Sequence, residues 1–97
     1  SMPMGDAGGM AKHDHQKAQM EGMQRMHDEM MQGMMKEDAD VAFICGMIAH
    51  HRGALAMANV ELKFGDNEEA RGMAQKVIEA QTKEIANMTR WLQANAK

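Results

Sequence analysis

Two adjacent histidines stand between two methionines in the segment MIAHHRGALAM, which covers residues 47–57. His51 follows Met47 by one helical turn, and Met57 follows His50 by two turns. On a helix, such spacings place an imidazole and a thioether on the same face. Thioether sulfur is a soft ligand and imidazole is intermediate, so the combination favours Cu(I), with Ag(I) as its mimic, over hard ions such as Mg²⁺. The segment therefore predicts a copper site.

The preceding segment, residues 12–36, combines the same two residue types at higher density. Its Met and His side chains recur at intervals of three and four residues, which is the pattern of a heptad seam. The seam consists of His13, Gln16, Met20, Met23, His27, Met30 and Met34. Six side chains of this segment are further candidate metal ligands, namely His13, His15, Met23, His27, Met30 and Met34.

The methionine content indicates that sulfur itself is needed. The chain has 14 Met and one Cys, and its aromatic fraction is 3%. Methionine fills gaps in a core but specifies a unique packing poorly. Thioethers bind soft metals without losing a proton and do not cross-link as thiols do, which suits copper handling outside the cytosol. Ser1 and Met2 are typical of a cloning remnant ahead of a mature chain, so we expect a periplasmic or secreted protein whose signal peptide has been removed.

Each of these residues also has a structural interpretation. A single Met at a seam position is more often core filler than ligand, and one His on an apolar face is usually only hydrogen-bonded. A methionine-rich helix can also serve as an adaptable surface for binding peptides. The sequence therefore leaves open an alternative function, a helical interaction or self-assembly module in which metal binding is incidental.

Other chemistries lack the residues that they require. No Glu has a His three residues later, as a di-iron centre needs, and one Cys is too few for structural zinc. The sequence has no HExxH motif, phosphate-binding glycine loop or nucleophilic serine motif, so we expect no enzyme. A net charge of −3 with scattered Lys and Arg argues against nucleic acid as a partner. No unbroken apolar run reaches the roughly 20 residues that a membrane span needs.

The elements that must position these side chains are expected to be helices. Residues 1–11 contain the one Pro and several Gly, which predicts a flexible tail. Residues 12–97 are expected to form a single all-α domain of three long helices, over 12–36, about 38–64 and about 67–94. The second helix has a smooth side that would allow close approach of another helix, formed by Gly46, Ala49, Gly53 and Ala56. A chain this short buries a modest core, so we expect an antiparallel bundle completed by self-association.

Two patterns carry a resemblance to a known family. D-x-x-F-x-x-x-M-x-x-H-H-x-x-A-x-x-M-A begins at Asp40, and A-x-x-x-I-x-x-Q-x-x-E-I-x-x-M-x-x-W-L begins at Ala74. Together they resemble the family catalogued as domain of unknown function 305, with residues 38–95 as its core. The resemblance implies a ferritin-like helical bundle and a relation to exported copper-resistance proteins of the CopM type, which bind Cu(I) through Met and His. It also implies a site formed or bordered by Met47, His50, His51, Met57 and Met88.

The residues and the resemblance predict the same function. We expect a non-catalytic protein that buffers or sequesters Cu(I) as a homo-oligomer. Its expected partners are copper ions and a copper efflux system or chaperone that accepts the metal.

Overall fold

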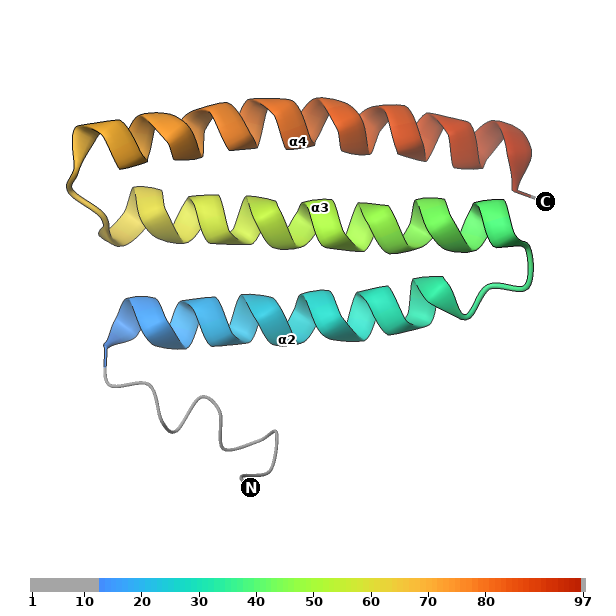
Figure 1. Ribbon diagram of the computed structural model, residues 1–97, viewed down its shortest axis with the longest axis horizontal. Coiled ribbons are helices and arrows are strands. Elements are labelled where there is room, and N and C mark those ends of the chain that lie inside the picture. Colours follow the sequence, from blue (N-terminus) through green and yellow to red (C-terminus); the bar gives the residue numbers. More distant parts are fainter. Residues whose placement is uncertain (1–12, 97) are drawn as a thin grey trace, which may run out of the picture.

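The computed structural model describes residues 13–96 and consists of three long antiparallel helices (Figure 1). They are α2 over Asp14–Met34, α3 over Ala39–Phe64 and α4 over Glu68–Asn95. Residues 13–96 contain no strand. The prediction of an all-α chain with three long helices is confirmed, and each helix begins and ends within two residues of its expected bounds. The tail predicted over residues 1–11 lies outside the described residues.

Side-chain caps determine where α3 and α4 begin. Asp38 accepts a hydrogen bond from the N–H of Val41 at 3.0 Å, and Asn67 accepts one from the N–H of Ala70 at 2.9 Å. These caps satisfy backbone donors that have no partner within the helix. Gly65 directly follows α3, and its N–H bonds back to the last turn of that helix. These short-range contacts determine where α3 begins and ends and where α4 begins.

The three helices form one layer with α3 in the middle (Figure 1). α3 packs against both neighbours, whereas α2 and α4, along their described lengths, do not contact each other. The Cα atoms span only 14 Å in the thinnest direction. Among α2, α3 and α4, no helix covers either broad face of α3. The buried apolar side chains that the structure describes are few and mostly small: Ile48, Ala49, Ala58 and Ala74.

Small residues allow α2 and α3 to approach closely. The contacting pairs are Gly22 with Ala56, Met26 with Gly53, and Gly33 with Cys45 and Gly46. Because glycine has no Cβ, the two backbones come nearer than larger side chains would permit. The smooth side predicted for the second helix is the surface against which α2 packs.

Adding a methyl group at Gly33 tests this close approach. A Cβ at Gly33 would lie 2.9 Å from the backbone carbonyl carbon of Cys45 and 3.0 Å from the backbone nitrogen of Gly46. Because backbone atoms cannot move aside, Gly33→Ala is expected to separate the helices and to lower the free energy of unfolding by about 1–3 kcal/mol. The measurement is thermal unfolding followed by circular dichroism.

Gly72 provides the matched control. A Cβ at Gly72, within α4, meets nothing within 4 Å. Gly72→Ala should therefore stabilise the chain by up to about 1 kcal/mol through helix propensity alone. Equal stabilisation by Gly33→Ala and Gly72→Ala would contradict the close contact between α2 and α3.

The heptad seam predicted for the first helix is not the line that faces α3. The contact line on α2 runs through Gly22, Met26 and Gly33. Met23 and Met34, each one residue further along, are 60% and 57% exposed. One residue corresponds to about 100° around a helix, so these methionines are turned out of the layer. Close packing through glycine determines the helix orientation here, and Met23 and Met34 are not core filler within one chain.

α3 is long and apolar enough to cross a membrane by length and composition, the one helix of residues 13–96 that is. A central helix of a soluble protein meets the same criterion, and α3 lies between α2 and α4 (Figure 1). That the chain does not span a membrane therefore remains a prediction from the sequence.

Candidate metal site

His51 is the buried polar side chain at the contact between α3 and α4. The residue is 9% exposed, and its Nε2 lies 2.6 Å from Oε2 of Glu84 on α4. The Glu84 side chain is 57% exposed, so the pair lies at the edge of the contact. An ionised carboxylate can only accept hydrogen bonds, so Nε2 carries a proton that it donates to Glu84.

The second ring nitrogen of His51, Nδ1, is buried and has no hydrogen-bond partner among the residues that the structure describes. In a neutral imidazole with the proton on Nε2, the free lone pair is on Nδ1. A buried acceptor without a partner costs free energy, so such an atom in a native structure needs an explanation. Metal-binding histidines typically donate their other N–H to a carboxylate or carbonyl, which orients the ring. His51 and Glu84 have this arrangement, with Nδ1 left for a metal ion.

Two methionines lie one turn away from this pair. Met47 precedes His51 by four residues on α3, and Met88 follows Glu84 by four residues on α4. Because α3 and α4 are antiparallel, both positions lie on the same side of the pair, about 6 Å along the helix axes. Both methionines are half-buried. The register therefore brings Met47 and Met88 to one level of the contact, next to His51.

A second unpartnered polar atom lies in the same contact. The side-chain oxygen of Gln81 is buried and has no hydrogen-bond partner within residues 13–96, and Gln81 precedes Glu84 by three residues on α4. In the sequence, Gln81 is the polar exception in an otherwise apolar repeat. The contact around His51 is therefore polar, with one nitrogen and one oxygen available to a ligand.

Most of the remaining candidate ligands line one broad face of the layer. In an antiparallel pair, the residues that directly follow the contact residues turn to the same side on both helices. On α2 these residues are Met23, His27 and Met34, and on α3 they are Met47, His50 and Met57. α4 packs against the other flank of α3, so on α4 the residues that directly precede the contact residues turn to this side. Met73 directly precedes the buried Ala74 and therefore lies on this side too.

We call this surface the methionine face and define it as Met23, His27, Met30, Met34, Phe43, Met47, His50, Met57 and Met73. Its large apolar side chains are unusually accessible. Five of them are between 57% and 63% exposed, namely Met23, Met34, Phe43, Met57 and Met73. The ring centroid of His50 lies 6.2 Å from that of His51, so the face and the buried histidine adjoin. Soft ligands thus lie on the surface and directly beneath it.

The opposite face of the layer is charged. The guanidinium of Arg52 lies 3.4 Å from the carboxylate of Glu29, a pair that joins α3 to α2. The same two residues line a shallow hollow between these helices together with Arg25, Asn59 and Lys63. We call these five residues the charged face. The two broad faces of the layer therefore differ sharply in chemistry.

Two predicted ligands lie apart from the others. His13 and His15 are at the start of α2, with stacked rings whose centroids are 5.7 Å apart. His15 also lies 6.3 Å from the ring of Phe64, at the far end of α3. Both histidines are exposed. The structure thus brings His13 and His15 together with each other but not with His51.

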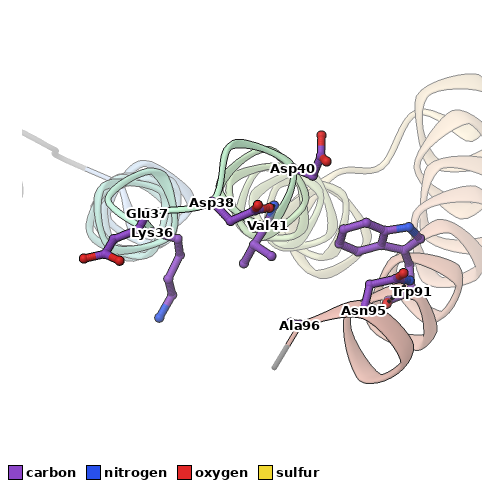
Figure 2. Close-up of a pocket in the computed structure, with 8 residues that line it drawn as sticks. All are labelled: Lys36, Glu37, Asp38, Asp40, Val41, Trp91, Asn95 and Ala96. Atoms are coloured by element: carbon purple, nitrogen blue, oxygen red, sulfur yellow. Dashed lines mark hydrogen bonds between the residues drawn. The ribbon is translucent and has the colours of Figure 1, made fainter.

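A separate hollow lies where the α2–α3 connection meets the end of α4 (Figure 2). It has a volume of about 610 Å³, and the indole of Trp91 points from α4 towards the start of α3. Asp38 lines it but already caps α3 through the N–H of Val41. None of the ligands predicted from the sequence lines this hollow. It is not part of the candidate copper site.

Sequence reasoning did not select Glu84 or Gln81 as site residues. Both lie in the second family pattern, and Gln81 is a polar residue in an otherwise apolar repeat, which is the signal that the sequence offered. Their role depends on which residue of α4 faces His51, and helix periodicity alone does not define that register. Within residues 13–96, no three side chains of His, Cys, Asp or Glu converge on one point. The candidate site is instead built from one imidazole and nearby thioethers.

Comparison with known proteins identifies a family. A family model described as "Domain of unknown function (DUF305)" matches residues 2–92, which is most of the chain. Among curated proteins, none matches this sequence.

Proposed function

The chain belongs to the DUF305 family, and we propose that it is a non-catalytic protein that binds Cu(I) and sequesters it outside the cytosol. In this proposal His51 binds the metal through Nδ1, with Met47 and Met88 as thioether ligands. Glu84 holds the ring through Nε2 and does not touch the metal. The exported location, and transfer of copper to an efflux system or chaperone, are parts of the proposal that follow from the preference for thioethers over thiols.

The observation that carries the proposal is the buried, unpartnered Nδ1 of His51. A histidine that serves only the fold would be expected to satisfy both ring nitrogens when buried. Here Nε2 lies 2.6 Å from the Glu84 carboxylate, and Nδ1 has no partner among the described residues. The half-buried Met47 and Met88 lie one turn away. Nitrogen and thioether sulfur together suit a soft monovalent ion.

The methionine face also supports Cu(I) binding, but it indicates a type of ligand and not one defined site. Its exposed thioethers include Met23 and Met57, which offer further soft ligands beside His27 and His50. If the face also binds metal, these residues would allow one chain to hold more than one copper ion. Exposed methionine is otherwise an unfavourable surface residue, because it leaves apolar area in water.

A second candidate function rests on the same face. Phe43 is 63% exposed and is a poor metal ligand, so its position among the methionines favours contact with another protein surface. A methionine-faced interaction module, with metal binding incidental, would use the face without using His51. Copper titration of the full chain distinguishes the two functions, because the module requires no stoichiometric Cu(I) site.

The proposed ligand set predicts a clear order of metal affinity. Cu(I) and Ag(I) should bind far more tightly than Zn²⁺ or Ni²⁺, because thioethers are soft and neutral. The measurement is competition against a Cu(I)-specific chelator and, separately, against a Zn²⁺ chelator, in reducing buffer without oxygen. Zn²⁺ affinity equal to or above that for Cu(I) would contradict the ligand set.

A further inference from the structure

Within residues 13–96, no second layer covers the methionine face. Stable domains are built from at least two packed layers of secondary structure, because each element must bury its apolar side. Here α3 contacts α2 and α4 only at its flanks, and the outer helices do not reach each other within the described residues. Five large apolar side chains of the face are more than half exposed as a result.

The difference in charge between the two faces shows which of them is suited to burial. The charged face carries Arg25, Glu29, Arg52 and Lys63 along the contact between α2 and α3. None of the nine residues of the methionine face carries a formal charge, and its titratable side chains are His27 and His50. Two carboxylates lie on the same side of the layer at the border of the face: Glu61, one turn after Met57, and Glu84, which is paired with His51. Burying the charged face would desolvate several charges, whereas burying the methionine face mainly removes apolar surface from water.

The size of the face fits a second copy of the same chain. A 26-residue helix is about 39 Å long, and three helices about 9 Å apart give a width of about 27 Å. The resulting footprint is roughly 1,000 Å² on each copy, or about 2,000 Å² in total. Stable protein interfaces bury about 1,200–2,000 Å² in total. The nine residues that define the face carry no formal charge, so they can pack against the same residues of a second copy, as a two-fold symmetric contact requires.

We propose that a second copy of this chain packs its methionine face against that of the first, and that the methionines of both copies then line one shared layer that binds Cu(I). The dimer forms without metal, and the shared layer rests on the proposed function. Met23, Met57, His27 and His50 of each copy have their open side towards the partner copy, which therefore supplies the ligands that one chain lacks. Metal bound between the copies stabilises the dimer by mass action.

The test is sedimentation equilibrium of the full chain, first without metal and then with Ag(I). Phe43→Glu places a charge within the face, on the central helix α3, at a residue that is not a proposed ligand. Met73→Glu does the same on α4 and serves if Phe43→Glu fails to fold. Asn59→Glu, on the charged face, is the matched control. Circular dichroism verifies the helix content of all three variants.

The parent and Asn59→Glu are expected to be dimers without metal, and Ag(I) should lower their dissociation constants further. Phe43→Glu should raise the dimer dissociation constant at least tenfold and weaken Ag(I) binding by the shared layer along with it. A parent that is monomeric in either condition, without metal or with Ag(I), would overturn the proposed dimer. An impaired dimer that binds Ag(I) as the parent does would overturn the shared layer while leaving Cu(I) binding by one chain intact. A dimer that binds no Ag(I) would refute the proposed function and the shared layer together, but not the contact between faces.

Discussion

Leucine in place of both Met47 and Met88 is expected to lower the affinity for Cu(I) at the His51 site by at least about tenfold while leaving the helices folded. Both residues lie one turn from the His51–Glu84 pair, at the same level of the α3–α4 contact. Leucine has nearly the volume and apolarity of methionine, so the packing is conserved and the stability cost stays below about 1.5 kcal/mol per site. Only the sulfur is lost. The measurement is competition for Cu(I) with a chelator of known affinity.

The matched control is the same substitution outside the site and outside the methionine face. Met31 and Met35 are 49% and 77% exposed and belong to neither. Met31→Leu combined with Met35→Leu should leave the Cu(I) affinity unchanged. If Met47 and Met88 can be replaced without any change in Cu(I) affinity, they are core filler, and the copper ligands must be sought in α2 or the N-terminal segment.

Removal of the Glu84 carboxylate should weaken Cu(I) binding by about 10–100-fold even though Glu84 is not a ligand. Groups that hold a metal-binding histidine through its second nitrogen usually have effects of this size. In Glu84→Ala the His51 ring loses the acceptor 2.6 Å from Nε2, so the proton is no longer fixed on that nitrogen and Nδ1 is no longer reserved for the metal. Glu84→Gln keeps an acceptor oxygen and should restore part of the affinity.

The partial rescue by glutamine separates a positioning role from a general loss of stability. Glu79 is an exposed carboxylate of the same helix, and Glu79→Ala is the control for charge. It should leave Cu(I) affinity within about twofold of the parent. Equal effects of Glu84→Ala and Glu79→Ala would mean that net charge, and not the hydrogen bond to His51, affects copper binding.

The helices and their ends could be predicted from local signals. Asp38, Asn67 and Gly65 act through side chains or backbone within one turn, and such short-range chemistry is visible in the sequence. The smooth side of α3 was predictable for the same reason, because small residues at helical spacing need no knowledge of the partner helix. What packs against them follows from the short connections between the helices.

The single-layer arrangement and the role of Glu84 were not predictable in this way. Periodicity suggested that Met23, His27 and Met34 face a partner helix, but the glycines beside them allow a closer contact and turn the methionines outward. The partner of His51 depends on the register between α3 and α4, which is set by the summed packing of the whole contact. Met47 and His51 were correctly placed one turn apart, whereas the carboxylate that orients His51 comes from another helix.

The most direct test of the copper site is nuclear magnetic resonance of the histidine ring nitrogens and methionine methyl groups during titration with Ag(I). One equivalent of Ag(I) is predicted to shift the Nδ1 resonance of His51 strongly, while Nε2 stays protonated and hydrogen-bonded to Glu84. The methyl resonances of Met47 and Met88 should move in the same step. An unchanged His51 Nδ1 resonance, with methyl shifts confined to the methionines of α2, would contradict a metal site at His51.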